Sequence, residues 1–216
     1  MKLYSYFRSS TSYRVRIALN LKGADYEQIS VDLKNKKHLE SEFGKINAFR
    51  TLPVLFAGDQ RMVQSLAIID WLEEFSPEPS FSPSTEPDRQ VCRELYYAIA
   101  TEIHAPNNLS VLDFLRTEYQ FDEAAIKKWC AKWIWRTFRP IETRLECHQW
   151  QSEDLPFGKP SLFEIALVPQ IYNAKRWEVD LSGFPLLLKI DEFCSRISAF
   201  QNAHPQNQMD SFGGPS

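Results

Sequence analysis

A run of hydroxyl side chains near the start of the chain could do chemistry. Ser9, Ser10, Thr11 and Ser12 directly follow a short aromatic stretch and directly precede a segment with helical spacing. Amide groups converge at the N-terminus of a helix, and together with hydroxyls they form a site suited to an anion. The same residue types cap helices, and taken alone capping is the simpler interpretation.

Two further junctions have a similar character. Leu52-Pro53 comes just before a predicted strand, where a cis proline would expose backbone groups able to pair with an extended peptide. A trans proline is the commoner arrangement at the start of a strand. Gln64-Ser65 precedes another helical pattern, and Ser65 would either cap that helix or hold a carboxylate. Taken alone, capping again explains it best.

The elements that would position these junctions alternate between strand and helix over about the first 75 residues. Strands are expected at residues 3–6, 29–33, 52–56 and 61–63, and helical segments at 13–22, 38–44 and 65–75. This order is typical of a thioredoxin-like α/β unit, which brings the three junctions to one edge. Such an edge suits a short peptide with a thiol and a carboxylate, and glutathione is such a peptide.

A segment rich in proline and serine divides the chain. Residues 76–84 include three prolines and four serines, which cannot continue a helix. Beyond this segment helices are expected over 88–115, 122–150, 161–175 and 185–197, with a capping box at Ser161 and Glu164. Pro106, Pro140 and Pro169 should kink or interrupt them. We therefore expect a thioredoxin-like domain at 1–77, a linker at 78–87, an all-helical domain at 88–210 and a disordered tail at 211–216.

Bulk properties exclude several classes of protein. A formal net charge of -3 on 216 residues gives no indication of a nucleic-acid or membrane partner. Arg8 interrupts the start of the chain where a signal peptide needs apolar residues, and no apolar run reaches about 18 residues, so we expect a cytoplasmic protein. No two of the four cysteines form a Cys-x-x-Cys pair, so a metal site is not expected.

A resemblance to a known family runs through both expected domains. It is carried by residues 4–19, 64–69, 102–104, 107–109 and 167–170, including the motifs Arg-Ser-Ser-Thr-Ser-Tyr-Arg and Gln-Ser. Together these segments resemble the zeta class of glutathione transferases, which includes maleylacetoacetate isomerase and bacterial maleylpyruvate isomerase. The resemblance implies glutathione as cofactor and the glutathione transferase fold, an α/β N-terminal thioredoxin-like domain followed by an all-α C-terminal domain.

The resemblance also implies roles for individual residues. Ser9, Ser10 and Thr11 would surround the glutathione sulfur as the catalytic hydroxyls. The residues that would bind the rest of glutathione are His38, Leu52, Pro53, Gln64, Ser65, Asn107 and Asn108. The carboxylates of the substrate would be bound by Arg8, Arg176 and His104.

Two positions depart from the pattern of related proteins. Thr11 stands where many zeta members have cysteine, so a reaction that needs a protein thiol is not expected. Isomerisation does not need one, because glutathione itself supplies a thiol. Leu109-Ser110 stands where some maleylpyruvate isomerases are richer in arginine, which weakens the maleylpyruvate interpretation.

The leading hypothesis is a glutathione-dependent cis–trans isomerase that converts maleylacetoacetate to fumarylacetoacetate in tyrosine and phenylalanine catabolism. Alternatives are a maleylpyruvate isomerase, a transferase that consumes glutathione on small α-haloacids, and a non-catalytic scaffold. Ser9, Ser10, Gln64 and Ser65 argue against a scaffold, whereas the missing cysteine argues mildly for one. The resemblance further implies a homodimer, with the first domain of one subunit against the helical domain of the other.

Overall fold

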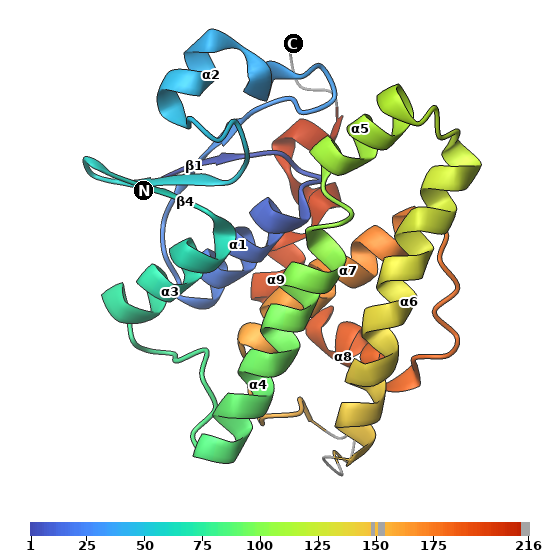
Figure 1. Cartoon of the computed structure of the whole chain (residues 1–216). Coiled ribbons are helices and arrows are strands. Elements are labelled where there is room, and N and C mark those ends of the chain that lie inside the picture. The colour runs from blue at the N-terminus through green and yellow to red at the C-terminus, as the bar shows by residue number, and fades with distance from the viewer. Residues whose placement is uncertain (148–149, 151–153, 213–216) are drawn as a thin grey trace. The chain divides into compact units, whose positions relative to one another are not determined.

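The computed structural model describes residues 1–147, 150 and 154–212 (Figure 1). Its contacts form two compact units, which are described in turn. The first unit joins Met1–Ser80 to Arg196–Ser216, and the second is Phe81–Ser195. The expected division placed everything from 88 to 210 in the helical domain, so the structure differs from it at the C-terminal end.

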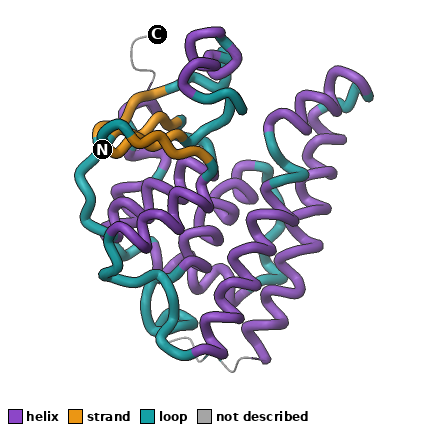
Figure 2. Tube along the Cα trace, turned by 60° about the vertical axis from the view of Figure 1, so that its left-hand side comes forward, coloured by secondary structure: helices purple, strands orange, loops and turns teal. Residues whose placement is uncertain are grey.

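A four-stranded mixed sheet forms the centre of the first unit (Figure 2). Its strands are β1 (Lys2–Ser5), β2 (Glu27–Ser30), β3 (Val54–Ala57) and β4 (Gln60–Val63). The strand order is β2-β1-β3-β4. β1 is parallel to β2 and antiparallel to β3, and β4 is antiparallel to β3. The expected α/β, thioredoxin-like order is therefore confirmed.

The helices of the first unit begin and end close to their expected positions. They are α1 (Ser10–Leu21), α2 (Ser41–Ile46) and α3 (Ser65–Phe75), with a 3₁₀ turn, η1, at Lys37–Leu39. Gly23 follows α1 with φ +62, the left-handed conformation that glycine adopts most readily, and its amide bonds to the carbonyl of Asn20. α1 is buried from Ser12 to Leu19 and packs against α3.

A short helix near the C-terminus, α9 (Ser198–Ala203), packs on α1 and explains the corrected division (Figure 1). Phe200 is buried, and the side chains of Arg16 and Asn20 on α1 donate to the carbonyls of Ala203 and Ala199, each at 3.0 Å. Two 3₁₀ turns follow, η3 (Pro205–Asn207) and η4 (Met209–Phe212). Part of the expected tail is therefore ordered, and residues 213–216 lie outside the described part of the chain.

All the regular elements in the described part of the second unit are helices (Figure 1). Its helices are α4 (Glu86–Ala98), α5 (Leu109–Glu118), α6 (Glu123–Cys147), α7 (Leu162–Arg176) and α8 (Pro185–Cys194). A π-helical segment, η2 (Ile99–His104), continues α4, and the helix expected over 88–115 is interrupted around Pro106. α6 and α7 continue through Pro140 and Pro169, so the prolines do not interrupt them. None of the helices in the described residues is long and apolar enough to cross a membrane.

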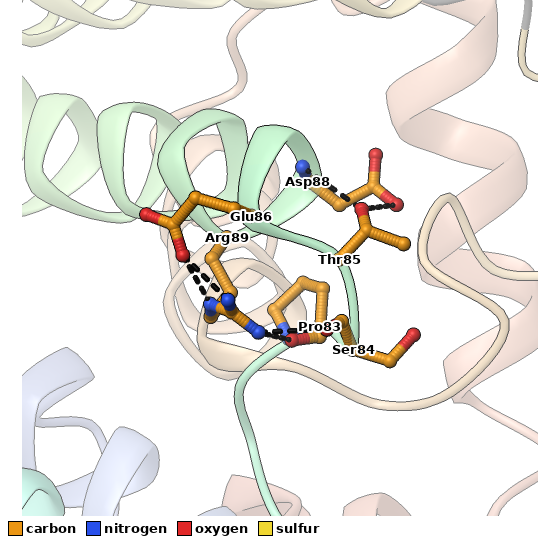
Figure 3. Close-up of polar contacts among 6 residues, drawn as sticks. All are labelled: Pro83, Ser84, Thr85, Glu86, Asp88 and Arg89. Carbon is orange, nitrogen blue, oxygen red and sulfur yellow. Dashed lines mark hydrogen bonds and ion pairs between the residues drawn. The ribbon is translucent and has the colours of Figure 1, made fainter.

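α4 begins two residues before its expected start because Thr85 caps it (Figure 3). The Thr85 hydroxyl accepts the amide of Asp88 at 3.3 Å and donates to the Asp88 carboxylate at 2.7 Å. Arg89 bonds back to the Glu86 carboxylate and to the Ser84 carbonyl, both at 2.7 Å. These contacts give the end of the expected linker a defined conformation.

Two buried carboxylates hold helix N-termini in the second unit. Glu164 accepts the amide of Ser161 at 2.8 Å while the Ser161 hydroxyl accepts the amide of Phe163, so the expected capping box is confirmed. Glu142, on α6, accepts the amides of Leu186 and Leu187 in the first turn of α8, at 2.7 and 3.1 Å. The first of these carboxylates is marked by a local sequence pattern, and the second is not.

Candidate active site

The register of the sheet brings three polar junctions to one edge. Tyr4 on β1 pairs with Val54 on β3, and Val54 pairs with Val63 on β4. β1 and β4 reach this row at their C-terminal ends, whereas β3 begins there. The segments before α1, before β3 and before α3 therefore leave the sheet side by side, as the thioredoxin-like interpretation predicted.

Hydroxyl groups connect the first two junctions. The Thr11 hydroxyl donates to the carbonyl of Leu52 at 3.0 Å, and Ser9 Oγ lies 2.9 Å from Thr11 Oγ1. Because a hydroxyl has a single proton, Ser9 must be the donor to Thr11. Ser9 is also the N-cap of α1 and accepts the amide of Ser12 at 3.2 Å. The Ser9 oxygen is thus held in place by the Ser12 amide, while the Ser9 proton is donated to the neutral hydroxyl of Thr11.

Ser10 and Thr11 add donors that are not used within the described residues. The side chain of Ser10, the first residue of α1, has no hydrogen-bond partner there, and neither backbone amide of this pair has an acceptor. Free amides at the first turn of a helix are the usual donors to a bound anion. This end of α1 can therefore receive a negatively charged group.

The second junction contains a cis peptide bond between Leu52 and Pro53. The thioredoxin-like interpretation predicted this geometry, against the greater frequency of trans proline. The side chain of Asn47 donates to the carbonyl of Thr51 at 2.8 Å and holds the turn that leads into it. Leu52 itself is buried.

At the third junction Gln64 has an unusual backbone conformation, with φ 70 and ψ 117. A residue other than glycine at positive φ costs about 1–3 kcal/mol, and such residues cluster at functional sites. Gln64 occupies the N-cap position of α3, and its side chain makes no capping bond. Ser65 is the first helical residue and is buried, so of its two expected roles the helix cap is excluded, and binding of a carboxylate stays a prediction.

The remaining predicted residues of the first unit are Arg8 and His38. Arg8 is exposed, immediately precedes Ser9, and has its guanidinium carbon 4.9 Å from the centre of the Phe7 ring. His38 is half-buried in η1, on the segment that follows β2. Since β2 is parallel to β1, this segment leaves the sheet from the same edge as α1.

The helical unit holds the other four predicted residues. His104 ends the π-helical segment and is half-buried, while Arg176 ends α7 and is exposed. Asn108 caps α5 by accepting the amide of Ser110 at 3.1 Å. Asn107 is buried, and neither polar atom of its side chain has a partner among the described residues. The polar atoms of Asn107 thus have no protein partner in the described residues, whereas Asn108 is used by the fold.

All four cysteines belong to the helical unit, and three of them are buried. Burial raises the pKa of Cys92 and of Cys130 to about 11, and it raises the pKa of Cys194 as well. Cys147 is exposed at the end of α6 in the helical unit. No group of three potential metal ligands is found in the described residues. The hydroxyls and amides at the start of α1 are therefore suited to hold a thiolate supplied by a ligand.

Two residues that hold the loop before Ser9 were not predicted from the sequence. Arg16 is fully buried and donates to the carbonyl of Phe7 at 3.0 Å, and Asp210 accepts the amide of Phe7 at 3.0 Å. Arg16 lies within the family-like segment but resembles any helical arginine. No local pattern marks Asp210, because its partner lies near the opposite end of the chain.

Comparison with known proteins relates both units to one family. The family model for the glutathione S-transferase N-terminal domain matches residues 1–74. A maleylacetoacetate isomerase of Rhizobium meliloti is 42% identical over 203 residues, which cover 94% of this chain and 95% of that protein. The match therefore extends through the helical unit.

Two solved structures have the same fold. One is described as the holo structure of maleyl pyruvate isomerase, a bacterial zeta-class glutathione S-transferase; it is 42% identical, has a TM-score of 0.95, and the match covers 98% of this chain and 100% of that one. The other is a maleylacetoacetate isomerase from Anaeromyxobacter dehalogenans with glutathione bound in its active site. It is 35% identical, with a TM-score of 0.85 and 97% of each chain covered. The chain described here belongs to the zeta class of the glutathione transferase family.

Proposed function

We propose that this protein is a glutathione-dependent cis–trans isomerase that converts maleylacetoacetate to fumarylacetoacetate. The observation that carries the proposal is the anion-receptive start of α1, where Ser9, Thr11 and Leu52 are linked and two amides remain unused. Isomerases of maleyl compounds are among the relatives that match nearly the whole chain.

Glutathione fits this donor set as a cofactor. When bound, it supplies the thiol that adds to the activated cis double bond and leaves after rotation about the resulting single bond. The task of the protein is to keep that thiol ionised. Lowering a thiol pKa from about 8.5 by two units requires roughly 2.7 kcal/mol of preferential stabilisation of the thiolate.

Ser9 is the best-prepared of the three hydroxyls to stabilise the thiolate. A charged sulfur competes well with the neutral Thr11 hydroxyl for the Ser9 proton, because hydrogen bonds to ions are stronger. Ser9 Oγ does not have to move, since the amide of Ser12 fixes it. Thr11 meanwhile keeps its proton on Leu52, and Ser10 offers a second, freely rotating donor.

The other predicted residues would bind the remaining parts of the two ligands. We assign the γ-glutamyl end of glutathione to Gln64 and Ser65 and its backbone to Leu52 and Pro53. Further glutathione contacts are assigned to His38, Asn107 and Asn108. The substrate carboxylates are assigned to Arg8, Arg176 and His104, because a guanidinium matches a carboxylate in shape and charge.

The choice between two maleyl substrates rests on the start of α5. Relatives carry the names of both maleylacetoacetate and maleylpyruvate isomerases. Leu109 and Ser110 place no cation at this position, which favours maleylacetoacetate. By the same resemblance we assign the protein to tyrosine and phenylalanine catabolism in the cytoplasm. We also expect it to be a homodimer, and sedimentation of the purified protein tests this oligomeric state.

An NMR time course of the protein with maleylacetone tests the activity. The cis and trans olefin signals and the free thiol are followed with and without substoichiometric glutathione. We expect rapid conversion with glutathione unconsumed. Stoichiometric loss of the thiol with an α-haloacid and no isomerisation would instead indicate the transferase. Glutathione binding without any turnover would indicate the scaffold.

A further inference from the structure

We propose that Asp210, near the C-terminal end of the chain, is a positioning residue for the thiol site. Its carboxylate fixes the turn that places the Ser9 hydroxyl. The inference rests on the proposed function, because it concerns the same hydroxyl groups. It assigns a role in the reaction to a residue of η4, which the sequence led us to place beside a disordered tail.

The contacts of Asp210 converge on one carboxylate. Oδ2 accepts the backbone amide of Phe7 at 3.0 Å and the hydroxyl of Ser30 at 2.5 Å. Oδ1 lies 3.5 Å from the side-chain amide of Gln28. Ser30 and Gln28 are on β2, so they hold Asp210 against the sheet while its remaining bond reaches the loop after β1.

Phe7 occupies a decisive place in that loop. The amide of Ser9 donates to the carbonyl of Tyr6 at 3.0 Å, which closes a turn with Phe7 as its second residue. The amide of Phe7 is bound by Asp210, and its carbonyl accepts from Arg16 at 3.0 Å. The turn is therefore held at both the amide and the carbonyl of Phe7. Its last residue is Ser9, whose hydroxyl caps α1.

Both hydrogen bonds that hold Phe7 depend on the C-terminal segment. Arg16 also donates to the carbonyl of Ala203 at 3.0 Å and to the Ser5 hydroxyl at 3.0 Å. The segment from α9 to η4 thus carries one carboxylate that binds the loop directly and one carbonyl that orients the arginine beneath it. Loss of the carboxylate should displace Ser9 without changing any group that touches the ligand.

The charge of Asp210 and the position of the Ser9 hydroxyl should have opposite effects on the pKa of the glutathione thiol. This difference makes the inference testable. A negative charge near a thiolate raises the thiol pKa, so removal of the Asp210 charge alone should lower it. Displacement of the Ser9 hydroxyl should raise it, because a donor to the thiolate is lost. Asp210→Asn removes the charge and keeps an acceptor oxygen for Phe7, whereas Asp210→Ala removes both.

The experiment titrates the ultraviolet absorbance of the thiolate of glutathione bound to full-length variants. In Asp210→Ala we expect the thiol pKa to rise by about one unit, which means about tenfold less thiolate below that pKa. In Asp210→Asn it should stay unchanged or fall. Ser30→Ala is the matched control, because it removes a partner of Asp210 and leaves the bond to Phe7, and it should not raise the pKa.

A thiol pKa in Asp210→Ala that is equal to or below that of the unsubstituted protein would overturn the inference. So would an equal rise in Ser30→Ala, which would indicate that Asp210 only docks the segment. If Asp210→Ala does not fold, Asp210→Glu retains the charge and displaces the acceptor, and it should raise the pKa. Failure of the proposed function is seen separately, as an unshifted thiol or absent isomerisation in the unsubstituted protein.

Discussion

At the scale of single residues, the proposed thiol site depends on which acceptor each hydroxyl proton points to. Thr11 gives its proton to a backbone carbonyl, and Ser9 gives its proton to Thr11. The sequence placed these residues at one helix start but could not rank them, because a ranking needs the position of Leu52, 41 residues later in the chain. The structure supplies that partner, and Ser9 becomes the donor whose proton is most easily redirected.

Replacement of Ser9 tests this ranking. We expect Ser9→Ala to lower kcat/KM for maleylacetone by about 100-fold, since a preorganised donor to a reacting anion contributes roughly 10²–10³ in rate. Ser10→Ala should have a smaller effect, because its hydroxyl is not held in place. Steady-state kinetics with saturating glutathione measures both.

Ser9→Ala also removes a helix cap, which costs about 1 kcal/mol of stability. Thr85→Ala is the matched control, because Thr85 caps α4 in the same way in the other unit. Thr85→Ala should lower the melting temperature to a similar extent and leave kcat/KM unchanged. Equal losses of activity in the two variants would contradict the ranking.

Glu164 predicts a pH dependence of stability. Complete burial raises its pKa from 4.5 to about 7 in the folded protein. Between these values the folded state binds a proton that the unfolded state has released, so the free energy of unfolding falls as pH rises from about 4.5 to about 7. The loss from this residue amounts to about 3 kcal/mol and is complete above pH 7.

Urea unfolding at pH 5 and pH 8 measures this loss. Glu164→Gln keeps an acceptor for the amide of Ser161 without a titrating group, so its free energy of unfolding should lack this component. An identical pH dependence in the two proteins would show that other groups are responsible.

At the scale of elements, local signals predicted what local contacts determine. The capping box of α7 and the glycine after α1 were readable because the interacting residues lie within a few positions of each other. α9 was missed because six residues are too few to show a helical period, and its burial depends on α1. The start of α8 likewise depends on Glu142, on a different helix.

We therefore expect Glu142→Ala to destabilise α8 from a distance. The change leaves the amides of Leu186 and Leu187 without their buried acceptor, which costs about 2–3 kcal/mol. Hydrogen exchange at these two amides should accelerate more than exchange in α7. Glu146→Ala, one turn further along α6 and exposed, is the control and should change stability by less than about 0.5 kcal/mol.

At the scale of the whole molecule, the N-terminal unit is made from both ends of the chain. The sequence showed a domain boundary at the proline-rich segment, and the structure has one there, at Ser80. Sequence patterns could not show that the chain returns to the first unit after Ser195, because the contacts concerned join residues about 180 positions apart. Only the packed structure places them together.

This return predicts that a C-terminal side chain stabilises the N-terminal unit. Phe200→Ala should lower the free energy of unfolding by about 3–5 kcal/mol, because Phe200 is only 2% exposed. Phe75→Ala serves as the control, since Phe75 is 61% exposed at the end of α3 in the same unit. Denaturant unfolding, with glutathione binding as the probe of the first unit, measures the free energy of unfolding of both variants. Equal effects of the two substitutions would contradict the role of α9.

Because the first unit contains both ends of the chain, the order of translation also affects the order in which the two units can fold. A nascent chain emerges from the ribosome N-terminus first, and domains fold as their residues become available. Residues 81–195 are complete before α9 and η4 have been translated, so the helical unit can fold while the first unit still lacks its last segment. A chain that terminates prematurely before residue 196 would therefore lack α9 and Asp210, although it contains every residue that we assign to the ligands.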